Sequence, residues 1–136
     1  MVGDEVVLEA ARAIRFYLPD LTGPGAEGLD EQLASLLAAA GRGELVVERL
    51  LDVLDDHPAT HSWVAGFLEY QLPPEAVETR ERYAGLPGHG EVTRAPRFLC
   101  PSGDFSWYRT RVGLVPPRCP THGFELARAE PQQPTC

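Results

Sequence analysis

The feature that most constrains this chain is a stretch near its C-terminus in which two Cys-Pro turns flank an aromatic run. The first turn reads Cys-Pro-Ser-Gly-Asp from Cys100, and the second reads Cys-Pro-Thr-His-Gly from Cys119. The run between them begins Phe-Ser-Trp-Tyr-Arg-Thr-Arg, which is the composition of a β-strand. A unit of about 30 residues buries too little surface to fold easily by itself. We therefore expect side chains of the two turns to hold it together.

The second turn has the spacing of a metal-binding knuckle. Zinc is bound by about four thiolate, imidazole or carboxylate ligands in a tetrahedron, and a Cys-x-x-His turn presents two of them from one loop. Cys119 and His122 have this spacing. Both are predicted zinc ligands.

The first turn supplies one thiolate, from Cys100, but its second ligand is out of place. The expected position is occupied by Gly103, and Asp104 follows directly. A carboxylate oxygen can bind zinc at about 2 Å, so Asp104 is the nearest replacement. His89, on a Gly-rich segment, is the other candidate. The predicted ligand set is Cys100, Asp104, Cys119 and His122.

On these motifs, residues 97–127 resemble a zinc ribbon, a small β unit with two metal-binding knuckles joined by a hairpin. The resemblance implies that Cys100, Cys119 and His122 bind zinc. It also implies a structural role for the metal, since such sites can contribute on the order of 10 kcal/mol to folding. Two alternatives stay open. One is a degenerate ribbon without metal that packs on the rest of the chain, and the other is a catalytic zinc with an open coordination position.

The N-terminal part has the pattern of a bundle of short helices. Apolar residues recur at three- and four-residue spacing over 4–18, 30–40, 44–55 and 60–72. The third of these segments has the widest apolar face and is predicted to be the central helix. In the first segment, Glu9, Arg12 and Arg15 fall on the polar side, which we expect to face water. Short connections predict that neighbouring helices pack antiparallel.

Prolines, glycines and one threonine mark the expected helix ends. Pro19 is expected to end the first helix before a Gly/Pro loop over 20–28. Thr60 is the candidate N-cap of the fourth helix, and Pro73 and Pro74 stop it. The predicted fold class is α+β, with a bundle of four to five short helices followed by a small zinc-ribbon-like β hairpin unit.

These boundaries divide the chain into four parts. The helical bundle is predicted over 1–72 and the zinc-ribbon-like β module over 96–129. The linker between them, 73–95, contains a Leu-Pro-Gly-His-Gly run and, over 75–82, a segment compatible with a short helix. The Pro- and Gln-containing tail, 130–136, is predicted to be disordered.

Charge is unevenly distributed along the chain. The net charge is −8, but residues 1–81 hold 5 arginines and 16 acidic residues, while residues 82–136 hold 7 arginines and 4 acidic residues. The acidic half argues against nucleic acid as the main partner, because phosphate binding depends on clustered cations. The basic C-terminal part fits an acidic partner, which includes this chain's own helical part.

The aromatic run permits a second interpretation. Trp107, Tyr108, Arg109 and Arg111 are of the types that stack on bases and bind phosphates. A nucleic-acid-binding regulator is therefore an alternative function. The competing explanation is that Trp107 packs the ribbon against the helices while the arginines pair with the acidic half.

Composition predicts a cytoplasmic protein without a membrane segment. No run approaches the roughly 20 apolar residues that span a bilayer. The N-terminus is acidic, unlike a signal peptide. The odd number of cysteines fits a reducing compartment, where structural disulfides are rare.

No Gly-x-Ser-x-Gly motif, phosphate-binding Gly loop or Ser/His/Asp order is present in the sequence. His57 and His61 lie four apart, but Pro58 stands where a zinc-protease helix has Glu, so a cap or surface role is expected. The helical part resembles, in helix number and length, the death-fold-like adaptor domains of bacterial conflict systems. We therefore predict a non-enzymatic adaptor or regulatory protein with a protein partner. A nucleic-acid regulator and a metal-dependent hydrolase are the alternatives.

Overall fold

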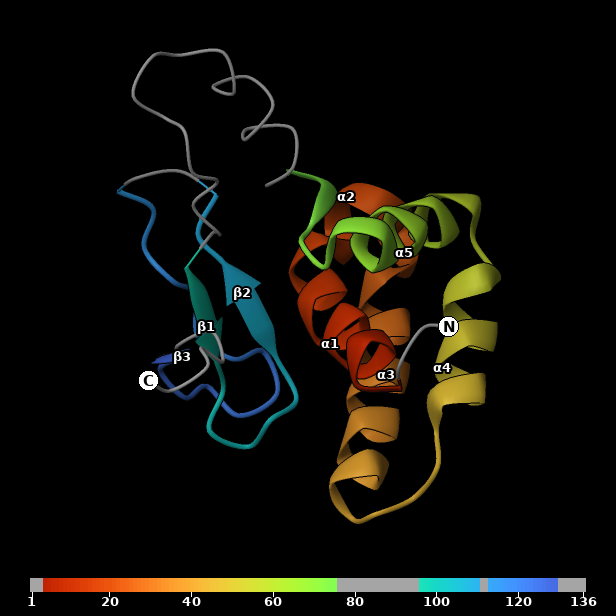
Figure 1. Ribbon diagram of the computed structural model, residues 1–136, viewed down its shortest axis with the longest axis horizontal. Coiled ribbons are helices and arrows are strands. Elements are labelled where there is room, and N and C mark those ends of the chain that lie inside the picture. The colour runs from red at the N-terminus through yellow and green to blue at the C-terminus, as the bar shows by residue number, and fades with distance from the viewer. Residues whose placement is uncertain (1–3, 76–95, 111–112, 130–136) are drawn as a thin grey trace, which may run out of the picture.

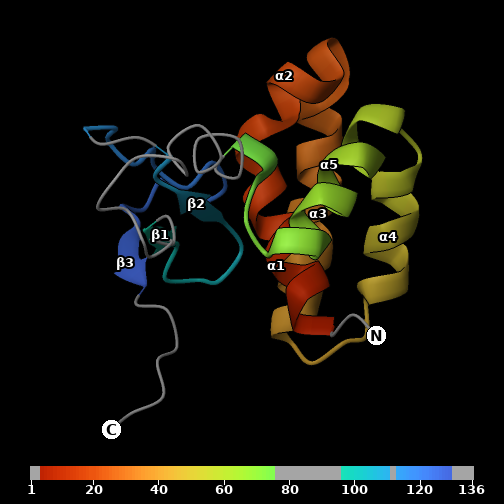
Figure 2. The same ribbon diagram turned by 45° about the horizontal axis from the view of Figure 1, so that its top comes forward.

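The computed structural model describes residues 4–75, 96–110 and 113–129 and has an α+β fold, which confirms the predicted class. We call residues 4–75 the helical part and residues 96–129, without 111–112, the β module. Figures 1 and 2 show the helices gathered on one side and the small sheet on the other, with α1 facing the sheet. The segment 75–82 beyond Glu75, the alternative ligand His89 and the tail 130–136 lie outside the described residues.

The helices are α1 (Asp4–Ile14), α2 (Leu18–Thr22), α3 (Ala26–Gly41), α4 (Val47–Asp55) and α5 (Pro58–Tyr70), with 3-10 turns at Arg15–Tyr17 and Gly23–Gly25. Pro19 does not end the helical run, contrary to prediction. It lies in the first turn of α2, where a proline has no hydrogen bond to lose. The predicted loop over 20–28 is also largely helical, since α3 already begins at Ala26.

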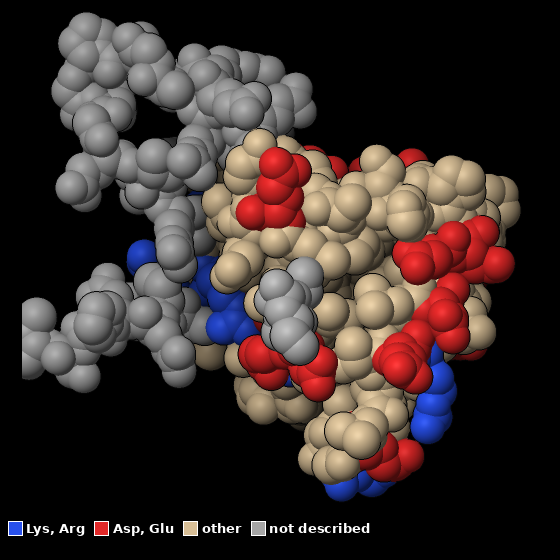
Figure 3. Space-filling model, turned by 45° about the vertical axis from the view of Figure 1, so that its right-hand side comes forward, with Lys and Arg blue, Asp and Glu red and all other residues tan. Residues whose placement is uncertain are grey.

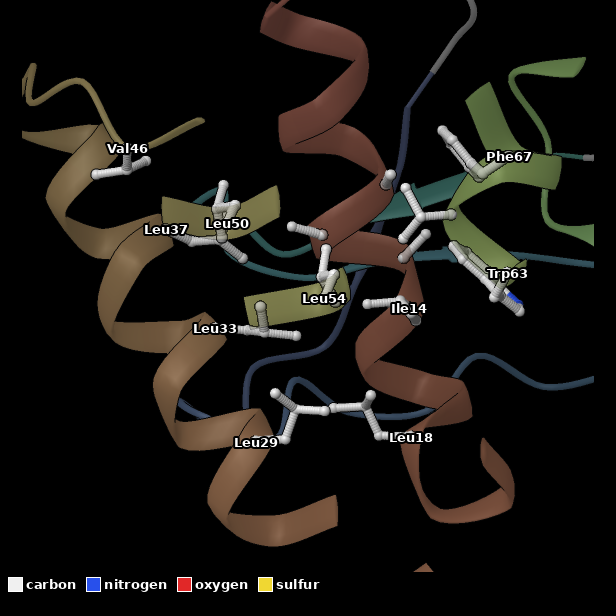
Figure 4. Close-up of a cluster of buried hydrophobic side chains, with 14 of the residues drawn as sticks. Ile14, Leu18, Leu29, Leu33, Leu37, Val46, Leu50, Leu54, Trp63 and Phe67 are labelled. Atoms are coloured by element: carbon white, nitrogen blue, oxygen red, sulfur yellow. The ribbon is translucent and has the colours of Figure 1, made fainter. Parts of the chain in front are cut away.

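The central helix is α1, and the prediction that segment 44–55 is central was wrong. α1 contacts α3, α4, α5 and strand β2. In Figure 4, Ile14 of α1 lies between the leucines of α3 and the aromatic rings of α5. α4 buries only Leu50 and Leu54 along its length. The wide apolar face of segment 44–55 did not make it the central helix. α1 is central because other elements cover its polar side as well as its apolar side.

The start of α5 also differs from the prediction. The N-cap residue is His57, and Pro58 occupies the first turn. Thr60 lies inside the helix, where it is buried and its hydroxyl donates to the backbone carbonyl of Leu54. Thr60 therefore ties α5 to the end of α4 rather than capping its own helix.

The sheet is antiparallel with the order β2-β1-β3, from β1 (Arg97–Leu99), β2 (Ser106–Tyr108) and β3 (Ala127–Ala129). The hairpin β1–β2 encloses the first Cys-Pro turn, and β3 follows the second. A hairpin was expected between the two turns. In the structure, the hairpin is formed by β1 and β2 on either side of the first turn, and β1 also pairs with β3.

Strand β2 is buried on both faces, and its side chains alternate as predicted. Trp107 packs in the core of the β module with Phe98 and Phe105, whereas Tyr108 joins the core of the helical part. Ser106, on the same side as Tyr108, reaches α1. The strand therefore connects the two cores.

The surface reflects the charge pattern of the sequence. Acidic side chains are spread over the face of the helical part seen in Figure 3, with few arginines among them. Among the described residues, no helix is both long and apolar enough to cross a membrane.

Candidate metal centre

The two Cys-Pro turns are closed in the same way. The N–H of Cys100 donates to the carbonyl of Phe105 at 2.9 Å, and the N–H of Cys119 donates to the carbonyl of Phe124 at 3.0 Å. Each turn thus spans Cys-Pro-x-x-x-Phe and returns the chain beside its cysteine. This shared pattern is visible in the sequence and is more informative than the Cys-x-x-His spacing alone.

The turns differ in the position of their glycine, and this difference explains the unusual ligand. His122 precedes Gly123, which has φ 70°, whereas Asp104 follows Gly103, which has φ 83°. Glycine adopts such left-handed conformations at little cost. The bend therefore comes one residue earlier in the first turn, and Asp104 supplies the side chain that His122 supplies in the second.

The four predicted ligand side chains meet in one place. Their ligand atoms, from Cys100, Asp104, Cys119 and His122, all lie within 4.8 Å of one another. Cys119 Sγ lies 3.5 Å from Asp104 Oδ1 and 3.7 Å from His122 Nδ1, and Asp104 Oδ2 lies 3.3 Å from His122 Nδ1. Tetrahedral zinc bonds of about 2.0–2.3 Å place such atoms about 3.3–3.6 Å apart. The arrangement is compatible with a zinc site.

Three of the four proposed ligands are buried, and the fourth is exposed to solvent. Cys100, Cys119 and Asp104 are buried, while His122 is exposed and stacks on Phe124 with ring centroids 5.2 Å apart. Burial raises the pKa of the Cys119 thiol to about 11, and the Asp104 carboxylate adds to this effect. A divalent cation would act in the opposite direction, because it binds the thiolate form.

Ser102 is a member of the site that the sequence reasoning missed. Its Oγ donates to Asp104 Oδ1 at 2.9 Å and lies 3.0 Å from Cys100 Sγ and 3.1 Å from His122 Nδ1. Serine is not among the usual zinc ligands, so no spacing rule singles it out. Hydrogen bonds of this kind orient metal ligands.

Two arginines of the helical part reach the turns, although both were expected to face water. Arg12 Nε donates to the carbonyl of Gly103 at 2.8 Å. Arg15, only 4% exposed, donates to the carbonyl of Asp104 at 2.7 Å and to Thr121 Oγ1 at 2.6 Å. The polar side of α1 is therefore the docking face of the β module.

Glu9 lies on the same face and binds the strands. Its carboxylate accepts hydrogen bonds from Arg97 at 2.7 and 2.8 Å, from Ser106 at 3.0 Å and from Tyr108 at 2.6 Å. Burial alone would raise its pKa, but the bonds from Arg97 and Tyr108 and the charges of Arg97 and Arg12 outweigh burial and hold the pKa below its ordinary value. The expectation that the basic C-terminal part pairs with the acidic half is confirmed for Arg97.

The other candidate groups do not join this site. Trp107 and Tyr108 are buried, and Arg109 lies over the ring of Phe98 at 5.0 Å, so these three do not form an exposed stacking surface. Arg111 lies outside the described residues. His61 forms an exposed pair with Asp55, with Nδ1 and Oδ1 2.7 Å apart, in agreement with a surface role.

Comparisons of this chain with protein-family models, curated proteins and solved structures find no match. Two thiols, one imidazole and one carboxylate form a donor set that suits zinc.

Proposed function

We propose that this chain is a non-enzymatic adaptor or regulatory protein-interaction module whose β module is a zinc ribbon held by a structural zinc ion. The observation that carries the proposal is the convergence of four donor side chains, whose ligand atoms all lie within 4.8 Å of one another. Four protein ligands fill the coordination sphere, as in structural sites, whereas catalytic sites keep a position for water or substrate. This argues against a zinc hydrolase.

Zinc would cross-link the two turns. Cys100 and Asp104 come from the first turn, and Cys119 and His122 from the second. The core that surrounds them is small. It consists of Phe98, Cys100, Phe105, Trp107 and Cys119, with Leu114 and Leu126 at its margin. An ion is a source of the folding free energy that a core of this size lacks.

The interaction role is supported by the surface charge of the helical part and by the burial of the aromatic side chains of β2. The helical part presents an acidic surface, which suits a basic protein partner better than nucleic acid. The aromatic side chains Trp107 and Tyr108 are used internally and do not favour a nucleic-acid reader. Cys100 and Cys119 are free thiols, so both are available to bind a metal ion. The resemblance to death-fold-like adaptors suggests a bacterial defence system.

Metal analysis of protein purified without chelators tests the zinc site. We expect roughly one zinc ion per chain, because the four proposed ligands make up one site. The ion should be lost in Cys119→Ser and greatly reduced in Asp104→Ala. Cys136→Ser removes a cysteine outside the ligand set and is the matched control, with full zinc expected. Wild-type protein without zinc, or zinc retained in Cys119→Ser, would contradict the proposal.

The interaction role is tested separately by affinity purification from the native cell. An adaptor should carry a stoichiometric protein partner that dissociates as salt is raised, because screening weakens contacts between exposed charges. Recovery of the chain alone at low salt would count against this role and would leave the zinc site unaffected.

A further inference from the structure

The guanidinium of Arg15 contacts both turns of the metal site at once. Nη1 donates to the backbone carbonyl of Asp104 at 2.7 Å, and Nη2 donates to Thr121 Oγ1 at 2.6 Å. Asp104 is itself a proposed ligand, and Thr121 is the residue before the ligand His122. One side chain of the helical part is thus bonded to a ligand residue in the first turn and to a ligand's neighbour in the second.

Arg15 is in turn held from two sides. Asp30, on α3, accepts from Nε at 2.5 Å and from Nη2 at 3.1 Å. The guanidinium also lies over the ring of Phe105, 5.7 Å from its centroid. A planar guanidinium has five N–H donors in a fixed fork, so it can serve Asp30 and both turns together, whereas lysine presents a single mobile ammonium.

Asp104 needs such support because of the residue before it. Gly103 is in a left-handed conformation and has no atom within 4 Å of where a Cβ would stand, so the bend is held by hydrogen bonds, such as that from Arg12 to the Gly103 carbonyl, and not by packing. Ligands of a metal site must be held within about 0.5 Å of their bonding positions to bind tightly. The bond from Arg15 fixes the backbone of Asp104 from outside the turn.

We infer that Arg15 is a positioning residue for the metal site. From its place in the helical part, it sets the distance between the first turn and the second. This inference rests on the proposed zinc site and adds to it. Metal affinity then depends on the docking of the β module against α1. By linkage, bound metal strengthens that docking by the same factor.

Titration with Co²⁺ tests the inference, because the visible absorption of bound Co²⁺ reports both affinity and coordination geometry. The variants are Arg15→Lys and Thr121→Val, and the second removes one hydroxyl while keeping the shape. We expect each to bind Co²⁺ about 10–100-fold more weakly than wild type, as for other supporting contacts of metal ligands. Their absorption should shift toward that of Asp104→Ala. The control is Arg42→Lys, which changes a 65% exposed arginine that pairs with its near neighbour Glu44 and should leave Co²⁺ binding like that of wild type.

A double variant separates positioning from general destabilisation. Because Arg15 and Thr121 share one contact, Thr121→Val should add little further loss of affinity in the Arg15→Lys background. Circular dichroism under the same conditions reports whether each variant is folded, and Thr121→Val decides the question if Arg15→Lys does not fold. If folded Arg15→Lys and Thr121→Val bind Co²⁺ with the affinity and the spectrum of wild type, the inference about Arg15 is overturned and the proposed zinc site is not. Absence of Co²⁺ binding by wild type and control would overturn the proposed zinc site and the inference with it.

Discussion

At the scale of single residues, Glu9 joins the helical part to the β module through one carboxylate. It accepts bonds from Arg97 on β1 and from Ser106 and Tyr108 on β2. These residues lie 88 to 99 positions from Glu9, so no local spacing in the sequence connects them. Loss of the Glu9 carboxylate would leave the charge of Arg97 and the hydroxyl groups of Ser106 and Tyr108 without their hydrogen-bond acceptor.

We predict that Glu9→Gln lowers the free energy of unfolding by about 1.5–3 kcal/mol, the range for a lost hydrogen bond to a charged group. Urea denaturation at neutral pH measures this. Glu5→Gln is the matched control, since Glu5 lies on the same helix and also contacts Arg12 but is 77% exposed. Exposed pairs contribute little, so the control should unfold like wild type. Equal effects of the two substitutions would disprove the assignment.

The lowered pKa of Glu9 predicts a pH dependence. A carboxyl group with a lowered pKa in the folded state adds stability above its unfolded-state pKa and loses it as pH falls through the folded-state pKa. The ordinary value is 4.5. Wild type should therefore lose more stability than Glu9→Gln between about pH 5 and pH 2. Urea denaturation across this range measures the difference, and parallel curves for the two proteins would refute it.

At the scale of elements, the pattern of apolar residues predicted the four longer helices, but it missed the short helix α2 and some of the helix ends. Pro19 shows why: a proline is excluded from the interior of a helix but accepted in its first turn, and only the surrounding chain decides between the two. The two Cys-Pro turns were easier to predict from the sequence, because the residues that form each turn are adjacent in the chain. Gly103 and Gly123 each give one turn its bend.

We predict that Gly103→Ala lowers the free energy of unfolding of the protein by about 1–2 kcal/mol, the cost of a Cβ in a left-handed conformation. Crowding does not contribute, since no atom lies within 4 Å of the added Cβ. Gly28→Ala is the control: it is equally uncrowded but lies in α3, where alanine is favoured and up to about 1 kcal/mol of stabilisation is expected. Thermal unfolding compares them, and a stabilising Gly103→Ala would contradict the assigned turn.

At the scale of the whole molecule, the described residues form two cores of unequal size. The larger core lies among the helices and includes Tyr108 of β2, and the smaller one surrounds the two cysteines. Removal of the proposed zinc therefore affects the two parts differently. The helical part keeps its apolar core, whereas the β module loses the cross-link between its turns.

We predict that chelation raises amide hydrogen exchange throughout 96–110 and 113–129, while α3 and α4 stay protected. Hydrogen–deuterium exchange with and without chelator measures this, because exchange reports local opening. α1 should show an intermediate response, since it contacts β2 and the other helices. Cys119→Ser should reproduce the effect without chelator. Unchanged exchange in the β module would mean that its fold does not depend on metal.

The sequence by itself determined the α+β class, the four longer helical segments and the four side chains that meet at the candidate metal centre, including Asp104. These follow from periodicity and from spacing within short turns, which are local properties of the chain. Only the tertiary structure decided that α1 is central and that Glu9 and Arg15 face the β module. Charged residues on a helix look solvent-facing in a sequence, because their partners lie on distant strands and turns, and only folding brings the two together.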